Sequence, residues 1–495
     1  MSKKEQENLQ QDLQQQELAP AEAIGPEGRA ELEKQRQEAL VRRNKMGNMP
    51  VGRLLVSMSV PIIISMLVQA LYNIVDSIFV AQLGEEALAA VGFAFPLQNL
   101  MIAVAVGTGV GMNSVLGRRL GEKNVTAANR VAVNGLFLAV ASWAVFALLG
   151  FFGSAWYVSA FADNSITGGV AQMAESYLSI VCIGSLGLFL AVTTERLLQA
   201  TGRTVFSMVS QMVGAVLNII LDPIMIFGWF GFPAMGVAGA ALATVIGQFG
   251  SMILAIAYNK LKNHELNLSL KGFRPNWTAI KHIYRVGVPS IIMQSLGSVM
   301  LFCMNLIMVP FGTTAVSVLS VYFRLQSFIF MPVFGLNSGM IPIIAFNYGA
   351  QNRLRIEKTI QRCVVVAVAI MLFGTALFWI FPGFLLGLFD AGPAMLELGT
   401  HALRRTSIAF PFVGVSIVFS GVFQALGRGA YSLIVSLIRQ LGIMIPAAWL
   451  LAQLGGAELI WFSGPIAEIS CMFIAIAFFR MAYKKIIKPL PLGAP

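Results

Sequence analysis

Long uninterrupted runs of apolar residues restrict the fold of this chain more than any other feature of its sequence. Several runs reach twenty residues, the length that an α-helix needs to cross a hydrocarbon core of about 30 Å. Only 12% of the 495 residues are charged and 57% are hydrophobic, whereas a water-soluble domain carries about 25% charged residues. These values exclude one or two water-soluble domains, and the ten-residue alternation of an outer-membrane barrel does not occur. The sequence predicts an all-α protein that crosses the lipid bilayer many times.

Twelve apolar segments are long enough to span a membrane, and their basic flanks alternate. Both chain ends and the loops after the second, sixth and eighth segments are rich in Lys and Arg, whereas the loops after the odd-numbered segments, such as 153–168 and 382–400, contain none. By the positive-inside rule, both termini lie in the cytoplasm and the number of spans is even. We expect a plasma-membrane protein, such as one of a bacterial inner or cell membrane. The predicted spans are 54–81, 88–116, 130–152, 172–200, 204–228, 236–259, 283–309, 315–346, 358–381, 396–425, 429–452 and 457–482.

The net charge of +11 arises from these loops and does not indicate a nucleic-acid partner. Residues 1–50 are nearly neutral, with eight Lys or Arg against nine Asp or Glu, and Ala30–Lys45 could form a charged helix. The four cysteines stand singly in apolar segments, without a nearby His or a CxxC pair. We expect no cofactor, disulfide or cysteine metal site, and interpret as small core residues Cys182, Cys303, Cys363 and Cys471.

The chain contains an internal repeat. At an offset of 228 residues, 60–124 aligns with 288–352 without a gap, and at an offset of 225, 199–203 aligns with 424–428. Identical pairs include Gly107 with Gly335, Gly111 with Gly339, Gly121 with Gly349, and Arg203 with Arg428. Two parallel six-helix repeats, an N-lobe and a C-lobe around a central cavity, follow from this pattern. Two lobes that rock about a shared cavity are typical of a secondary transporter.

The repeat also predicts the domain organisation. We expect a cytoplasmic polar tail at 1–50, an N-lobe of six helices at 51–260 and a basic cytoplasmic linker at 261–281. A C-lobe of six helices at 282–485 and a short cytoplasmic tail at 486–495 complete the chain. We expect it to be a monomer.

Two carboxylates lie inside predicted spans, where an ionisable group needs a partner or a task. Asp76 shares a helix face with Asn73 and Gln69 in the first span, and Asp222 has Asn218 one turn deeper in the fifth. Both carboxylates lie at a similar distance from the outer end of their span. They can share or exchange a proton, or bind Na⁺ together with Asn218 through oxygen ligands. Alternatively, each carboxylate reaches outward or caps a neighbouring helix.

Other polar residues of the spans give weaker signals. Glu195, beside Arg196 near the cytoplasmic end of the fourth span, fits a locally satisfied charge as well as it fits a coupling role. The repeat aligns no acid of the C-lobe with these three acids, so we expect the coupling chemistry in the N-lobe. In the C-lobe we favour ion pairing of the cations, such as Arg439 with Glu468, over substrate contact. Candidates for the wall of a substrate cavity are Gln69, Thr244 (which also fits an ordinary helix hydroxyl), Gln294, Asn305 and Arg324.

Three motifs resemble those of the multidrug and toxic compound extrusion (MATE) transporters, in particular the bacterial multidrug-efflux branch. They are Gln69-x-x-x-Asn73-x-x-Asp76-x-x-Phe79, the segment 195–202 and Asn218-x-x-x-Asp222-Pro223, and the likeness extends over about residues 50–485. The resemblance implies antiport, in which H⁺ or Na⁺ binds at Asp76 and Asp222, with Asn218 as a neighbouring ligand. The acids that some relatives carry in spans seven and ten are missing, which argues against a sodium site in the C-lobe.

The predicted function is secondary active multidrug efflux, in which cationic or amphipathic organic compounds leave in exchange for H⁺ or Na⁺ by alternating access. An alternative with the same fold is a flippase for lipid-linked precursors or anionic substrates, in which C-lobe arginines such as Arg324 bind phosphate. An enzyme is disfavoured because the chain has three His and no HExxH, Gly-x-Ser-x-Gly or Walker motif. No loop resembles the selectivity filter of a channel.

Overall fold

The computed structural model describes residues 35, 39, 44–161, 168–269, 273–389 and 391–493, and within these ranges it contains helices and no strand. The helices of the first half are α3 (Lys45–Asn48), α4 (Val51–Ala81), α5 (Glu85–Gly121), α6 (Val125–Phe152), α7 (Ser154–Phe161), α8 (Gly168–Ile183), α9 (Leu186–Ala200), α10 (Thr204–Phe227), η1 (Trp229–Gly231) and α11 (Val237–Lys262). The predicted helix at Ala30–Lys45 and most of the 1–50 tail lie outside the described residues.

The second half repeats the order of the long helices in the first. Its helices are α12 (Trp277–Met308), η2 (Val309–Phe311), α13 (Thr313–Gly349), α14 (Arg353–Ile380), α15 (Pro382–Gly387), α16 (Pro393–Ser407), α17 (Phe410–Ala425), α18 (Gly429–Leu437), η3 (Ile438–Met444), α19 (Ile445–Ile460), α20 (Ser463–Ala482) and η4 (Tyr483–Ile487). Together the halves form the two-lobed helical fold that the repeat predicts.

Ten single helices and two bent pairs account for the twelve predicted spans. The bent pairs are the fourth span of each half, where α8 meets α9 at 43° and α16 meets α17 at 49°. Several predicted spans begin too late, because their helices start at asparagine caps that precede the apolar run. Asn124, Asn276 and Asn352 each accept a hydrogen bond from the backbone N–H three residues later, and so begin α6, α12 and α14.

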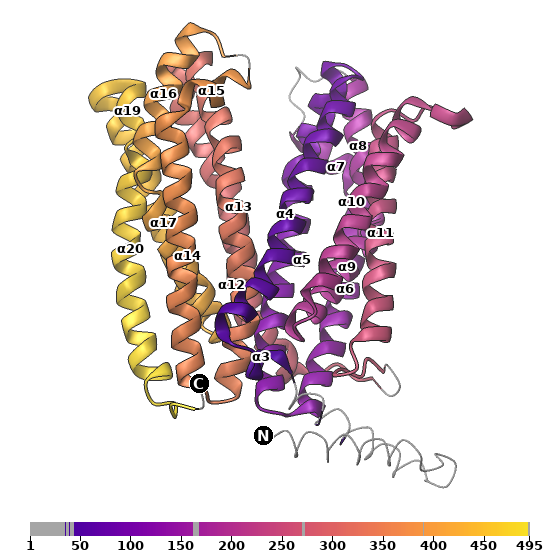
Figure 1. Cartoon of the computed structure of the whole chain (residues 1–495). Coiled ribbons are helices and arrows are strands. Elements are labelled where there is room, and N and C mark those ends of the chain that lie inside the picture. The colour runs from indigo at the N-terminus through magenta and orange to yellow at the C-terminus, as the bar shows by residue number, and fades with distance from the viewer. Residues whose placement is uncertain are drawn as a thin grey trace.

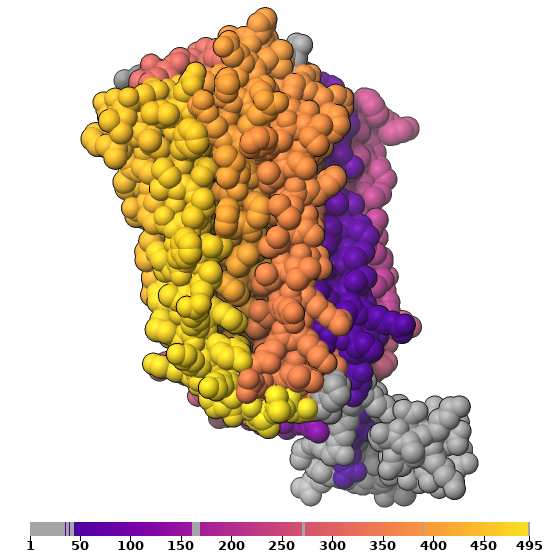
Figure 2. Space-filling model, turned by 60° about the vertical axis from the view of Figure 1, so that its left-hand side comes forward, coloured from indigo at the N-terminus to yellow at the C-terminus, as the bar shows by residue number. Residues whose placement is uncertain are grey.

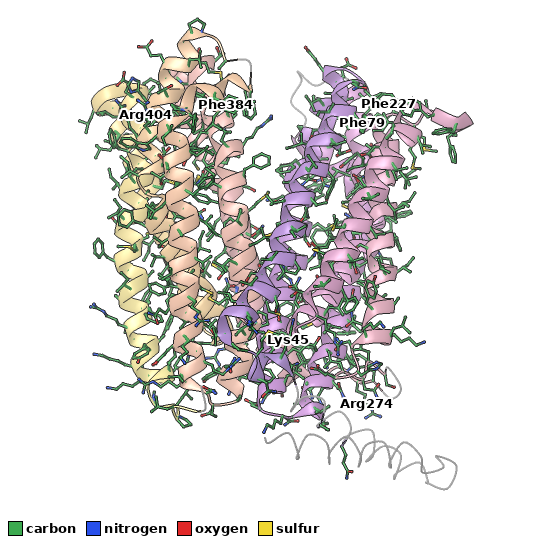
Figure 3. The ribbon with its side chains drawn as sticks, in the orientation of Figure 1. Lys45, Phe79, Phe227, Arg274, Phe384 and Arg404 are labelled. Atoms are coloured by element: carbon green, nitrogen blue, oxygen red, sulfur yellow. The ribbon has the colours of Figure 1, made fainter. Side chains whose placement is uncertain are left out.

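The two halves stand side by side and meet at one end of the molecule (Figure 1). Lys45 and Arg274 lie at this end, which we call the basic end, whereas Arg404 lies at the opposite end (Figure 3). In Figure 1 the ribbons of α4 and α13 approach each other toward the basic end and separate toward the opposite end. The contacts between the halves are therefore concentrated near the basic end.

Glycines that the repeat aligns form these contacts in matching pairs. A Cβ at Gly107 of α5 would lie 2.5 Å from Ile291 of α12, and a Cβ at the aligned Gly335 of α13 would lie 2.6 Å from Ile63 of α4. Ile63 and Ile291 are also aligned by the offset of 228. Nearer the basic end, Gly111, Gly121, Gly339 and Gly349 likewise have no room for a Cβ against the other half. The halves thus approach backbone to backbone, as small residues allow in membrane proteins.

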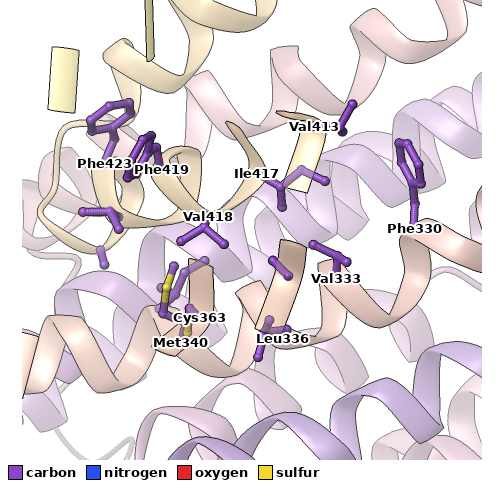
Figure 4. Packing of buried hydrophobic residues seen from close by; sticks show 14 of the residues in the cluster. Phe330, Val333, Leu336, Met340, Cys363, Val413, Ile417, Val418, Phe419 and Phe423 are labelled. Atoms are coloured by element: carbon purple, nitrogen blue, oxygen red, sulfur yellow. The ribbon is translucent and has the colours of Figure 1, made fainter. Parts of the chain in front are cut away.

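Apolar side chains fill each half and also cover its outside. In the second half, Phe330, Met340, Cys363, Val418 and Phe423 pack together between α13, α14 and α17 (Figure 4). Three of the four cysteines are buried and Cys303 is half-buried, as expected for small apolar residues. Seen from the side of α20, the second half is a continuous wall of helices (Figure 2). Large apolar side chains on the outside, such as the 70%-exposed Phe373, suit contact with lipid rather than water.

The short helix α3 fills a cleft between the halves at the basic end. On one side, the Asn44 amide donates to the Thr201 carbonyl and to the buried Glu265 carboxylate. On the other side, Arg355 donates to the carbonyls of Met46 and Met49 at 3.0 and 2.7 Å. The contacts of α3 therefore join the first half to the second.

We predict that Gly111→Ala destabilises the protein, because its Cβ would collide with the backbone of Ile283 and Gly287. Overpacking of this kind lowers the free energy of unfolding by about 1–3 kcal/mol. The matched control is Gly92→Ala on the same helix, where a Cβ meets nothing within 4 Å. The control should leave stability unchanged or raise it by about 0.5–1 kcal/mol, because alanine favours a helix over glycine. Thermal unfolding in detergent measures both effects, and equal melting temperatures would contradict the close contact.

We predict a pH effect at Glu265, which lies after the end of α11. Burial raises the pKa of Glu265 from 4.5 to about 7, although the Asn44 amide and the charges of Arg203 and Lys45 lower it in part. A raised acid pKa contributes stability below pH 4.5 that is lost as the pH rises to about 7. Melting temperatures of wild type and Glu265→Gln should therefore diverge over this interval, with the wild type losing more stability. Glu397→Gln, at an exposed carboxylate, is the control and should follow the wild type.

Candidate functional site

Two carboxylates of the first half, the half-buried Asp76 and the buried Asp222, lie at the same depth. Asp76 lies five residues before the end of α4, and Asp222 lies five residues before the end of α10. Beyond them, toward the opposite end, Phe79 and Phe227 contact each other with ring centroids 6.3 Å apart (Figure 3). Asp222 is fully buried, and the charge of Asp76 acts on it. The structure thus brings together the two acids that the sequence analysis pairs.

Asn218 and Thr244 connect this acid pair to α11. The Asn218 amide donates to Asp222 Oδ1 at 3.2 Å and lies 3.5 Å from Thr244 Oγ1. Thr244, which we expected in the wall of the substrate cavity, instead lies beside Asn218. Three buried oxygens of this group have no hydrogen-bond partner: Asp76 Oδ1, Asn218 Oδ1 and Asp222 Oδ2. An unpaired buried acceptor is costly, so the group is suited to bind a proton or a small cation.

Two tyrosines that the sequence analysis missed complete the cluster. The charges of both Asp76 and Asp222 act on Tyr72 of α4 and on the buried Tyr177 of α8. Tyr72 lies four residues before Asp76 and three after Gln69, so the helical period places it near this polar face and could have indicated it. Tyr177 comes from another helix and has no comparable signal in the sequence. We define the acid cluster as Asp76, Asp222, Asn218, Thr244, Tyr72 and Tyr177.

Glu195 lies outside the acid cluster, in a polar site of its own. Its carboxylate accepts hydrogen bonds from Gln211 of α10 at 2.7 Å and from Ser251 of α11 at 2.9 Å. The neighbouring Arg196 donates to Gln199 instead. Glu195 therefore accepts its hydrogen bonds from two other helices, while the charge of the neighbouring Arg196 also acts on it.

The remaining predicted residues are more exposed and scattered. Asn73 and Gln69 are exposed on the face of α4 that carries Asp76. Gln294 and Arg324 are exposed on α12 and α13, and the Asn305 amide donates to the Leu301 carbonyl of its own helix. Among the described residues, no hydrogen bond or ion pair joins Gln294, Asn305 or Arg324 to the acid cluster. The predicted pair of Arg439 with Glu468 is present at 3.3 Å, and Arg405 pairs with Glu458 at 3.1 Å.

The sequence matches one transporter family in both halves. The family described as MatE matches residues 61–224 and 289–450. The first of these ranges contains every member of the acid cluster except Thr244. The chain belongs to the MATE family. This membership confirms the resemblance that the three motifs indicate, and it agrees with the two-lobed helical fold.

Curated MATE relatives and a solved structure are similar over almost their whole length. The multidrug export protein MepA of Staphylococcus haemolyticus is 27% identical over 425 residues, which cover 84% of this chain and 91% of that protein. A FAD transporter of Shewanella oneidensis is 27% identical over 443 residues, 88% of this chain and 96% of that protein. A solved structure of a multidrug resistance MATE transporter in an outward-facing conformation is 26% identical, with a TM-score of 0.83, and covers 91% of this chain and 98% of that one.

We predict that Glu195→Ala destabilises this MATE protein by about 1–3 kcal/mol, because it leaves the donors of the half-buried Gln211 and the buried Ser251 without an acceptor. Glu195→Gln keeps an acceptor oxygen and should cost less. Thermal unfolding of the two variants measures the difference. If the order is reversed, Glu195 is not held by these hydrogen bonds.

Proposed function

We propose that this MATE protein exports cationic or amphipathic organic compounds in exchange for H⁺ or Na⁺, with its basic end in the cytoplasm. The proposed orientation rests on the Lys and Arg residues of the loops at that end. The substrate class rests on family membership and on the similarity to the multidrug export protein MepA. Small organic compounds and the bilayer are the proposed partners, and no resident cofactor is required.

The observation that carries the proposal is the group of three unpaired buried oxygens in the acid cluster. Asp76 Oδ1, Asn218 Oδ1 and Asp222 Oδ2 can accept a proton or coordinate Na⁺, and either ion removes the cost of leaving them unpaired. Two carboxylates within electrostatic reach also repel each other, which favours uptake of one positive charge. A cationic substrate competes for the same negative charge, so ion binding releases it.

The contact between the halves gives the proposed cycle its first state. With the basic end closed by the glycine contacts, the coupling ion enters the acid cluster from the opposite end and the substrate leaves there. The ion-bound protein then opens at the basic end, where the ion leaves and a new substrate enters. Such a cycle requires only that ion and substrate bind the two states with different affinities.

We predict that Asp76→Asn and Asp222→Asn each abolish coupled export of ethidium from proteoliposomes, because the amide neither binds a proton nor carries charge. Wild-type protein is driven separately by a pH gradient and by a Na⁺ gradient, so that the two ions are distinguished. Glu397→Gln is the matched control, since it removes an exposed carboxylate of the second half and should retain export.

The gradient that drives export decides which role Asp76 and Asp222 have. Export driven by the pH gradient alone assigns Asp76 and Asp222 to proton exchange, and export driven by Na⁺ alone makes them ligands of the metal ion. Full activity of both Asn variants, with folded protein, would contradict the proposed coupling site.

A second candidate function is export of an anionic compound, favoured by the similarity to a FAD transporter and by the exposed Arg324. The Arg439 cation is compensated by Glu468, which leaves Arg324 as the better contact for a phosphate. The same proteoliposomes loaded with FAD test this candidate. If the wild type exports FAD but not ethidium, and Arg324→Gln loses the FAD export, this second candidate would replace the first proposal.

A further inference from the structure

A cavity of about 200 Å³ lies at the basic end, between the two halves and away from the acid cluster. Its wall comes from α5 of the first half, from α12 and α13 of the second, and from the turn between α17 and α18. The chemically distinctive side chains of the wall are Arg118, Arg119, His282, Arg285, Tyr348 and Arg428. The export proposed above uses none of these residues.

The cavity carries an excess of positive charge. Arg118 and Arg119 share one acid, Glu122, at 2.8 and 2.7 Å. Arg285 and Arg428 are exposed, and neither has an acidic partner within 4.0 Å among the described residues. Four guanidinium groups against one carboxylate leave three positive charges uncompensated.

The internal repeat relates this cavity to the cleft that α3 fills. At an offset of 228, Arg285 aligns with Ser57 and Arg119 aligns with Asn347, and at an offset of 225, Arg428 aligns with Arg203. Each of the three residues of the α3 cleft contacts α3 or its acid partner. Lys45 lies 3.4 Å from Ser57, Asn347 donates to the Met46 carbonyl, and Arg203 lies 3.8 Å from Glu265.

The two equivalent clefts therefore differ in the groups that compensate their positive charge. The cleft near Arg203 holds a helix of the chain and the acid Glu265. The cleft near Arg428 has arginines where the other has Ser57 and Asn347. Its one nearby acid, Glu122, already pairs with Arg118 and Arg119, and among the described residues no helix comparable to α3 lines it. The positive charge of this cavity therefore needs an anion that comes from outside the chain.

We propose that this cavity binds a phosphate group, carried either by an anionic phospholipid or by a soluble phosphate. The planar guanidinium groups of Arg285 and Arg428 match phosphate oxygens in charge and hydrogen-bond geometry. Basic pockets between membrane helices are known to bind lipid head groups on the cytoplasmic side. Because both halves line the cavity, one bound phosphate joins them and stabilises the state with the basic end closed.

Binding to the purified full chain in detergent tests this site without a transport assay. The probes are phosphatidylglycerol, phosphatidylcholine and inorganic phosphate, with native mass spectrometry for the lipids and calorimetry for the free ion. The site variant is Arg285→Gln with Arg428→Gln. The control variant, Arg274→Gln with Arg480→Gln, removes two exposed arginines at the same end outside the cavity.

The wild type and the control should bind phosphatidylglycerol about tenfold more tightly than the site variant does, and phosphatidylcholine should not distinguish the three proteins. If the site variant binds phosphatidylglycerol more weakly and the wild type does not bind inorganic phosphate, the ligand is a lipid head group. If the site variant instead binds inorganic phosphate more weakly than the wild type does, the ligand is a soluble phosphate. Equal loss in site and control variants shows a general charge effect and overturns the proposal, as does equal binding by all three. Single Arg428→Gln, at an exposed position, serves as the second variant if the double variant unfolds.

Discussion

Backbone contact between the two halves is the constraint on which the rest of the structure depends. Glycines of α5 and α13 let opposing helices approach until a single Cβ would collide, and the repeat places these glycines in matching pairs. Apolar side chains provide little net attraction between helices in a bilayer, because lipid is equally apolar, so close packing must supply the affinity. The helices α4 and α10, which carry the two acids, pack against each other within the first half, and the halves separate toward the end at which these acids lie.

The two halves share a fold but differ in their buried polar and charged groups. The first half holds the acid cluster and the satisfied Glu195, whereas the second holds ion pairs such as Arg439 with Glu468. The repeat therefore preserves what packing requires, the glycines and the bent fourth spans, while its polar positions have diverged. In the proposed exchange, the ion binds in the first half and the second half serves as its counterpart.

Much of the fold could be predicted from the sequence, because membrane insertion imposes simple rules on length and polarity. The twelve spans, the repeat and the pairing of Asp76 with Asp222 follow from apolar runs, aligned glycines and matching depth. The bends within two spans, the partners Gln211 and Ser251 of Glu195, and the approach of Tyr177 could not be predicted in this way. They depend on how separate helices are rotated about their axes, and a single sequence contains no direct record of that rotation.

The position of α3 makes the contact between the halves at the basic end unsymmetrical. Its hydrogen bonds reach Thr201 and Glu265 in the first half, and Asn347 and Arg355 in the second. If the basic end opens as in the proposed cycle, α3 cannot keep both sets of partners, so one set has to break first and α3 then moves with the half that it still contacts. In that cycle, the residue pairs that break first determine the order in which the halves separate, and within the described part of the chain only one of the two equivalent clefts holds such a helix.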